Sequence, residues 1–147
     1  MKFLAVITAR AGSKGVPRKN VKLLNGKPLT FYTLDVARKV LEDKDMCLST
    51  NDSELIELVT KERSYTVPFK RPEYLATDEA STYKVLLHAI DFYEKKEDYY
   101  DAIILLQPTS PLRTAKHLKD AIDLYKSSDV DMVVSVKEAK SNQYFKI

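Results

Sequence analysis

The sequence predicts an α/β domain with three layers, in which helices cover both faces of a mostly parallel sheet. Short apolar runs alternate along its 147 residues with amphipathic stretches whose apolar residues recur at helical spacing. Single helices between successive strands favour parallel pairing through right-handed crossovers. Irregular polar segments follow three of the predicted strands, and a parallel sheet gathers such segments along the edge formed by its carboxyl ends.

Five apolar runs predict the strands. The run at 102–106 is the most apolar, and we expect it to be buried on both faces of the sheet. Cys47 lies in the second run and is expected to be a small core residue; as the single cysteine, it excludes an internal disulfide. The predicted strands comprise residues 2–7, 46–50, 65–67, 102–106 and 132–136.

Amphipathic stretches between these runs predict four helices. Asn25-Gly26 is a strong turn signal ahead of the first of them. Asn51 or Asp52 can cap the second helix and Thr114 the last, because short polar side chains accept hydrogen bonds from the free N–H groups of a first turn. The predicted helices comprise residues 29–41, a stretch after residue 52 that buries Leu55, Ile56, Leu58 and Val59, residues 81–95 and residues 115–126.

Positive charge is concentrated at the start of the chain. Seven of the 24 Lys and Arg residues precede Asp35, the first acidic residue, so the rest of the chain holds 17 basic and 21 acidic residues. A local positive field on a mildly acidic body favours a small anionic ligand, whereas a nucleic-acid-binding domain usually carries a broad basic face. No apolar run approaches the ~18 residues of a membrane span. We therefore expect a cytoplasmic protein without nucleic-acid or membrane partners.

The loop 8-TARAGSKGVPRKN-20, which follows the first predicted strand, is suited to binding phosphate. Gly12 and Gly15 allow positive φ and a close approach of the backbone. An arginine can hold a phosphate through two parallel hydrogen bonds, and a lysine acts on it as a point charge. The loop side chains able to contact a polyphosphate or its sugar are Arg10, Ser13, Lys14, Lys19 and Asn20.

A flexible, solvated turn is the alternative interpretation of this loop. Its short element Gly12-x-x-Gly15 matches neither GxxxxGK[ST] nor GxGxxG, so the element alone is weakly specific. The position of the loop after a strand and its lack of acids favour a binding site. Two further irregular segments, 68–80 and 107–114, are expected at the same edge of the sheet and strengthen that interpretation.

Three motifs in order resemble one enzyme family. ARAGSKGVPRKN resembles the signature of the acylneuraminate cytidylyltransferases, the CMP-N-acetylneuraminic acid synthetases. The segment 71-RPEYLATDEAST-82 resembles their cytidine-side loop, and 105-LLQPTSPLRT-114 resembles their strand-end motif. The stretches 26-GKPL-29 and 48-LSTND-52 are also similar. The resemblance covers essentially the whole chain and implies a Rossmann-like fold of the nucleotide-diphospho-sugar transferase type.

This resemblance implies transfer of CMP from CTP to an acidic nine-carbon sugar, with release of pyrophosphate and with Mg²⁺. Arg10 and Lys19 carry the implied catalytic role, Lys19 nearest the reacting end, and Gln107 faces the sugar. Arg71 binds the cytosine carbonyl, and residues 80–82 read the edge of the base. The implied nucleotide-binding residues are Arg10, Gly12, Ser13, Lys14, Asn20, Arg71, Ala80, Ser81 and Thr82.

The motifs identify no metal ligand in this chain. Asp78 is the one acid near a motif that merits consideration, and a helix cap is at least as good an interpretation of it. The family's metal-binding aspartates, much of its sugar pocket and its dimer segment lie further along than Ile147. We therefore expect residues 1–147 to form one nucleotidyltransferase domain, shortened at its C-terminal end relative to the family, with a homodimer as the assembly that the family suggests.

Two alternatives stay open at this stage. One is a CTP-binding module or fragment without full catalytic activity, which the early end of the chain favours and the intact first loop opposes. The other is a sister nucleotidyltransferase that uses another acidic sugar. Among such sisters, the enzymes for eight-carbon keto acids are less favoured, because their first loop lacks the SKGxxxKN pattern.

Overall fold

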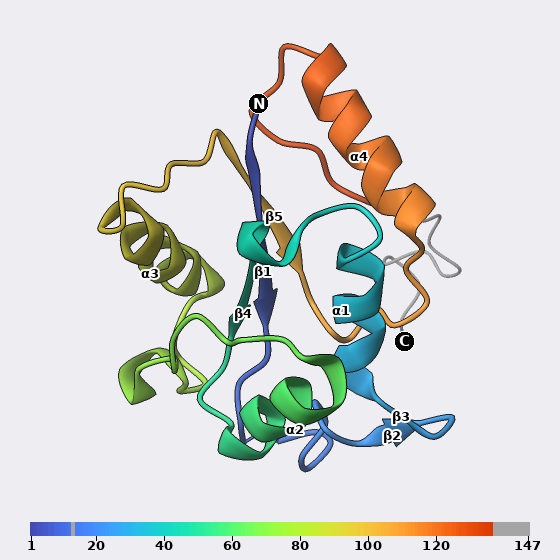
Figure 1. The fold of residues 1–147 in the computed structure, drawn as a ribbon, viewed down its shortest axis with the longest axis vertical. Coiled ribbons are helices and arrows are strands. Elements are labelled where there is room, and N and C mark those ends of the chain that lie inside the picture. The colour runs from blue at the N-terminus through green and yellow to red at the C-terminus, as the bar shows by residue number, and fades with distance from the viewer. Residues whose placement is uncertain (13, 137–147) are drawn as a thin grey trace, which may run out of the picture.

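The computed structural model describes residues 1–12 and 14–136 (Figure 1). Its central sheet has three parallel strands in the order β4-β1-β5: β1 (Phe3–Thr8), β4 (Met46–Ser49) and β5 (Ala102–Leu106). Strand β1 is central because Ala5 pairs with Met46 on one side and Phe3 pairs with Ala102 on the other. The helices are α1 (Leu29–Ala37), α2 (Ser53–Arg63), α3 (Thr82–Glu94) and α4 (Ala115–Ser127), with short 3₁₀ helices η1 (Asp43–Asp45) and η2 (Glu73–Leu75).

The sheet separates two apolar layers, because successive residues of a strand point to opposite faces. Phe3, Ala5 and Ile7 of β1 face the core shared with α1, α2 and α4. Leu4 and Val6 face the core shared with α3. Figure 1 shows α3 to the left of the strands and α1 and α4 to the right. The predicted parallel α/β fold with helices on both faces is confirmed.

A β-hairpin joins the first loop to α1. Its strands are β2 (Leu23–Leu24) and β3 (Lys27–Pro28), which pair antiparallel. The two connecting residues, Asn25 and Gly26, have φ values of 49° and 76°. Positive φ at both positions is the requirement of the two-residue turn that Asn-Gly favours, so the turn predicted there is confirmed.

The helix starts follow the predicted capping chemistry. Asp52 Oδ1 accepts from the backbone N–H groups of Glu54 and Leu55 at 3.1 and 3.3 Å. At α4, Thr114 Oγ1 accepts from the N–H of His117, whose Nδ1 accepts from the N–H of Thr114, each at 3.3 Å. Helix α1 ends at Ala37, short of the predicted residue 41, and a turn follows in which Val40 N–H donates to Ala37 O at 2.9 Å.

Two predicted strands are wrong. Residues 65–67 are not a strand, because Tyr65 turns inward: its hydroxyl donates to Met46 O at 2.8 Å and accepts from Leu48 N–H at 3.2 Å. The prolines that follow leave one parallel bridge, Thr50 with Lys70, as the contact of this segment with the sheet. Residues 132–136 form no strand and pair with none among the described residues, because a β-prone sequence needs a partner to form a ladder.

Strand β5 is less buried than its composition predicts. In the described part of the chain it lies at the edge of the sheet, and Leu105 is 39% exposed. An edge strand has a neighbour on one side alone, so its outer rim stays open to water. The expectation of burial on both faces is therefore wrong for this strand.

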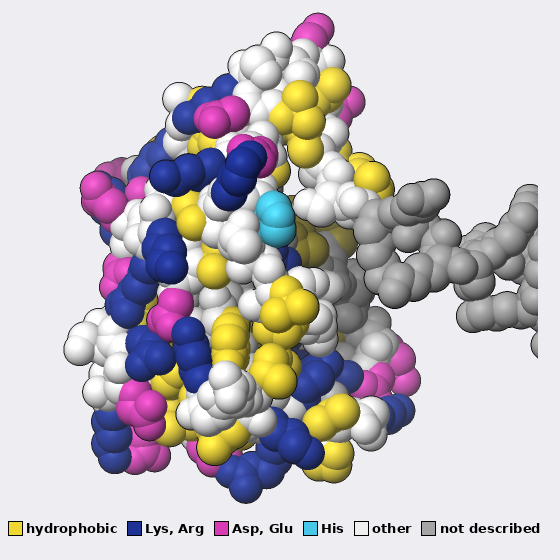
Figure 2. Space-filling model, turned by 90° about the vertical axis from the view of Figure 1, so that its right-hand side faces the viewer, with side chains coloured by type: hydrophobic (Ala, Val, Ile, Leu, Met, Phe, Trp, Pro, Cys, Tyr) yellow, Lys and Arg dark blue, Asp and Glu magenta, His cyan; other side chains and the backbone are white. Residues whose placement is uncertain are grey.

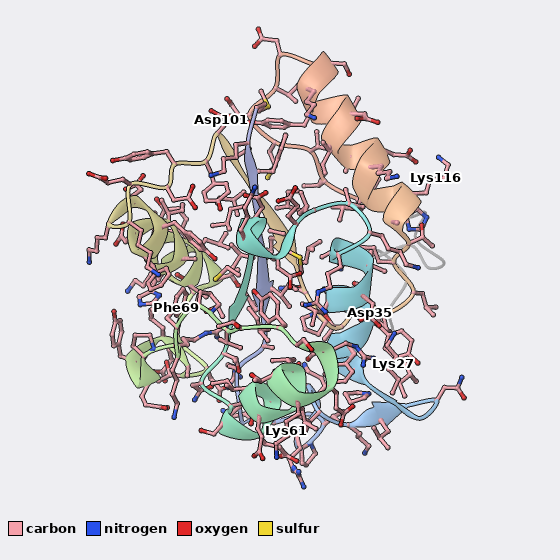
Figure 3. The ribbon with its side chains drawn as sticks, in the orientation of Figure 1. Lys27, Asp35, Lys61, Phe69, Asp101 and Lys116 are labelled. Atoms are coloured by element: carbon pink, nitrogen blue, oxygen red, sulfur yellow. The ribbon has the colours of Figure 1, made fainter. Side chains whose placement is uncertain are left out.

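Ion pairs and aromatic contacts bind the outer elements to one another. Asp35 of α1 pairs with Lys27 of β3, on the same side of the molecule in Figure 3, and with Arg63 Nε at 3.0 Å. Phe69, beside α3 in Figure 3, contacts the rings of His88 and Phe92 with centroids 4.7 Å apart in each case.

None of the helices in the described residues has the length and hydropathy needed to cross a bilayer.

Replacing Tyr65 with Phe tests how the buried hydroxyl anchors β4. The variant leaves Leu48 N–H without its partner, so the free energy of unfolding should fall by ~1–3 kcal/mol. Denaturant unfolding with an unchanged m-value measures this loss. Tyr99→Phe is the matched control, since Tyr99 is 65% exposed and its variant should unfold at the parent midpoint. Equal midpoints for the two variants would contradict the anchoring role.

Cys47 provides a second test of the core. It is fully buried, and burial raises the pKa of its thiol to about 12. A thiol that stays protonated and enclosed reacts slowly, because the thiolate is the nucleophile. We expect no modification by a disulfide reagent at neutral pH in the native protein and complete modification after unfolding in denaturant. Rapid modification of the native protein would show that β4 is accessible.

Candidate active site

A pocket of about 330 Å³ lies at the carboxyl edge of the sheet. It is formed where the first loop, the segment leading into α3 and the segment after β5 meet. All three are the irregular segments expected at this edge. The lining residues are Thr8, Arg10, Lys19, Asn20, Arg71, Leu75, Thr77, Ala80, Thr82, Val85, Gln107, Pro108 and Thr109.

The structure brings most of the sequence-predicted site residues together and leaves some apart. Seven of them line the pocket: Arg10, Lys19, Asn20, Arg71, Ala80, Thr82 and Gln107. Gly12, Lys14 and Ser81 do not line it, and Ser13 lies outside the described residues. Ser81 instead caps α3, where its Oγ accepts from Lys84 N–H at 3.3 Å.

The first loop is closed on itself at the base of the pocket. Asn20 is buried, and its Nδ2 donates to Arg10 O at 2.8 Å. The N–H of Ala11 donates to Asn51 Oδ1 at 2.8 Å, so Asn51 holds this loop while Asp52 caps α2. Gly12 adopts φ 72°, as a sharp turn here requires, whereas Gly15 lies outside the left-handed region, contrary to its predicted use. These hydrogen bonds hold the two ends of the basic loop in fixed positions.

Arg10 spans the gap between the first loop and the segment before α3. Its Nη1 donates to Gly12 O at 3.2 Å, and its Nη2 pairs with the Asp78 carboxylate. Lys14 Nζ pairs with the other oxygen of Asp78 at 2.5 Å. Lys14, with Arg10, holds the pKa of Asp78 below its usual range, so this carboxylate is ionised at neutral pH. Asp78 is therefore a counter-ion to two loop cations, and Ser81 rather than Asp78 is the cap of α3.

Arg71 lines the pocket and is almost wholly buried, with 4% of its surface exposed. Its Nε donates to Ser49 Oγ at 3.0 Å and its Nη2 donates to Ser49 O at 2.6 Å. Burial lowers the pKa of the Arg71 guanidinium to about 10, so the group is still charged at neutral pH. A buried charge is costly unless it is hydrogen-bonded, and the end of β4 supplies those bonds.

Lys19 is half-buried at the same pocket. In residues 1–12 and 14–136, no acidic side chain lies within ion-pairing distance of its ammonium group, in contrast to Arg10 and Lys14. On the face that Figure 2 shows, Lys and Arg side chains lie among Asp and Glu side chains. Within the described residues, Lys19 is thus a cation at the pocket without an acidic partner.

Sequence reasoning missed several lining residues. Thr8 is the last residue of β1, and the rule that ligands gather at carboxyl strand ends identifies it once the strand is placed. Pro108 and Thr109 directly follow Gln107 in the third motif, so the motif that predicts Gln107 at the site could have predicted them as well. Leu75 and Val85 are buried apolar residues that form part of the wall, and their place depends on tertiary packing that no local pattern reveals.

The described residues do not offer a metal centre of their own. No three His, Cys, Asp or Glu side chains in residues 1–12 and 14–136 lie close enough together to hold a metal ion. Two acids contact the first loop, and both are ion-paired there: Asp78 with Arg10 and Lys14, and Glu54 with Arg18. Mg²⁺ prefers several oxygen ligands in octahedral geometry, which these side chains do not provide.

Comparison with solved structures shows the fold. CMP:2-keto-3-deoxy-manno-octonic acid synthetase, solved in complex with CTP, superposes with a TM-score of 0.67 at 21% identity, covering 86% of this chain and 48% of that protein. A cytidylyltransferase from Leptospira borgpetersenii superposes with a TM-score of 0.64 at 20% identity, covering 88% of this chain and 50% of that protein. These similarities agree with the nucleotidyltransferase type of α/β fold predicted from the motifs.

Sequence comparison shows the family. The N-acylneuraminate cytidylyltransferase of Streptococcus agalactiae serotype V is 42% identical over 144 residues, covering 97% of this chain and 33% of that protein. The CMP-N,N'-diacetyllegionaminic acid synthase of Legionella pneumophila is 36% identical over 133 residues, covering 90% of this chain and 57% of that protein. This chain thus spans about one third to just over one half of these relatives. A family model described as cytidylyltransferase matches residues 4–146, and the chain belongs to this family, as its resemblance to the acylneuraminate cytidylyltransferases predicts.

Proposed function

We propose that this chain binds CTP and takes part in transfer of CMP to a sialic-acid-like nonulosonic acid, with release of pyrophosphate. The observation that carries the proposal is the pocket that unites Arg10, Lys19 and Arg71 at the carboxyl edge of the sheet. Relatives named for N-acylneuraminate, legionaminic acid and pseudaminic acid support an acidic nine-carbon sugar as the acceptor. We further propose that residues 1–147 act as one nucleotidyltransferase domain.

The cationic side of the pocket suits the triphosphate. A triphosphate carries a charge near −4, and each charge-assisted hydrogen bond to it stabilises the complex by about 1.5–3 kcal/mol. Arg10 and Lys19 lie at the pocket, and Lys14 lies beyond its lining on the same loop. Since Asp78 pairs with Arg10 and Lys14 in the free protein, the phosphates would take over the contacts that Asp78 makes.

The proposed reaction exchanges one P–O bond for another. The anomeric hydroxyl of the sugar attacks the α-phosphorus and gives up its proton to water, the bond from that phosphorus to the bridging oxygen breaks, and pyrophosphate leaves with the electron pair of that bond. Such a step asks the protein for in-line positioning and for stabilisation of charge on the phosphoryl oxygens. We assign the stabilisation of this charge to Arg10 and Lys19, and we assign contact with the sugar to Gln107.

The other wall of the pocket suits the base. Arg71 has donors only, and the carbonyl oxygen of cytosine is an acceptor. Leu75 and Val85 offer apolar surface to the base faces, and Ala80 and Thr82 border the pocket next to them. We propose that Arg71 contacts the cytosine carbonyl and that Ala80 and Thr82 read the edge of the base.

Mg²⁺ and a homodimer remain predictions from the resemblance, and a cytoplasmic location remains a prediction from the sequence. The described residues do not fit a metal centre, and we derive no step through one. A CTP-binding module without turnover is the second candidate. A sister enzyme with another acidic sugar is the third, and the Legionella and Campylobacter relatives keep it open.

Substitution of the pocket cations tests the phosphate side. Arg10→Ala or Lys19→Ala should lower turnover by roughly 10²–10³-fold, since each removes a preorganised donor to the transition state. The assay is pyrophosphate release from CTP, N-acetylneuraminate and Mg²⁺. Lys116→Ala on α4, with a 78% exposed side chain, is the control and should keep the parent rate. Parent-like rates in both pocket variants would rule out the role of the loop, and CTP binding without sugar-dependent release would favour the module.

Calorimetry with CTP, UTP, ATP and GTP tests the base side. The parent chain should bind CTP most tightly, and Arg71→Ala should weaken CTP binding by about tenfold or more, the scale of one lost charge-assisted hydrogen bond. ATP binding should be weak in both proteins, because the pocket wall accommodates a pyrimidine edge. Equal affinities of the parent for CTP and ATP would contradict base reading by Arg71 and residues 80–82.

A further inference from the structure

Ser49 is the residue that determines how Arg71 faces the pocket. It is fully buried at the end of β4 and does not line the pocket. Both of its oxygens nevertheless accept from Arg71: Oγ from Nε at 3.0 Å and the carbonyl from Nη2 at 2.6 Å. Two bonds from one planar guanidinium to one residue fix the plane of that group as well as its position. Nη1, which makes no hydrogen bond within the described residues, and the second N–H of Nη2 are left for a ligand.

The same serine ties together three parts of the site. Its carbonyl accepts from Ala9 N–H at 3.0 Å as well as from Arg71, and it stands opposite Thr8 in the register of β1 with β4. The N–H of Arg71 donates to Thr50 O at 2.7 Å, which places the backbone of residue 71 beside β4. The backbone contacts therefore position Arg71 at the pocket, and the Ser49 hydroxyl fixes the rotation of the Arg71 side chain.

We propose that Ser49 is a positioning residue for base recognition, which acts by holding the Arg71 guanidinium in the plane that presents Nη1 to the nucleobase. The inference rests on the proposed function, in which Arg71 contacts cytosine. Without the hydroxyl, Nε would be a buried donor lacking a partner, and the guanidinium would gain freedom to rotate. The proposed phosphate-binding cations would keep their hydrogen bonds, because the Ser49 side chain makes none with Arg10 or Lys19 in the described structure.

A binding experiment with two ligands separates this role from a general structural one. CTP engages both sides of the pocket, whereas inorganic tripolyphosphate engages the cations alone. Ser49→Ala should weaken CTP binding about tenfold, while tripolyphosphate affinity stays within about twofold of the parent. Thr33→Val is the matched control: it also removes a buried hydroxyl, from α1, and should leave both affinities unchanged.

A double-mutant cycle shows whether Ser49 acts through Arg71. In an Arg71→Ala background, Ser49→Ala should cause no further loss of CTP affinity, because the group that it positions is absent. An equal further loss in that background would overturn the proposal. So would a parallel loss of CTP and tripolyphosphate binding in Ser49→Ala, which would indicate general loosening of the site.

The outcomes distinguish this inference from the proposed function. Parent-like CTP affinity in Arg71→Ala would refute the base-side assignment itself. Weakened binding in Arg71→Ala with parent-like binding in Ser49→Ala would refute only the positioning role. If Ser49→Ala fails to fold, Ser49→Cys retains a similar side-chain shape with a weak sulfur acceptor, and it should show the same selective loss for CTP.

Discussion

Parallel pairing of β1 with both β4 and β5 is the constraint from which the site follows. Three strands that run in one direction must end at one edge, so the segments that leave them meet there. The pocket is lined by the segments that leave β1 and β5, by residues of the segment 71–80, which the Thr50–Lys70 bridge brings beside the end of β4, and by the start of α3. An antiparallel neighbour in place of β5 would send residues 107–109 to the opposite end of the molecule.

Sequence patterns predict well where a local cause is sufficient. The Asn25-Gly26 turn, the Asp52 and Thr114 caps and the buried Cys47 each depend on the chemistry of a few neighbouring residues. The prediction of a strand at 65–67 failed because the Tyr65 hydroxyl forms hydrogen bonds with the backbone of β4, and these are tertiary contacts. Periodicity describes what a segment prefers, and the neighbours decide whether a strand forms.

The candidate site shows the same division. The motif residues Arg10, Lys19 and Gln107 reach one pocket from the carboxyl ends of β1 and β5, as the rule for strand ends leads one to expect. Arg71 reaches the same pocket from a segment that follows no strand. The partners that hold them were not predictable, because Ser49 reaches Arg71 across 22 positions of sequence. The sequence does not show which contact a polar residue such as Ser49 makes, because that contact depends on how the backbone folds.

The bridge from Asp78 to Arg10 and Lys14 has a consequence for which anions can enter. This tethered carboxylate competes with every incoming anion at a high effective concentration. Chloride or a lone carboxylate offers one charge and gains little by exchange. A chain of linked phosphates can replace Asp78 at several contacts in one event, so the Asp78 bridge should favour polyphosphates over small monovalent anions.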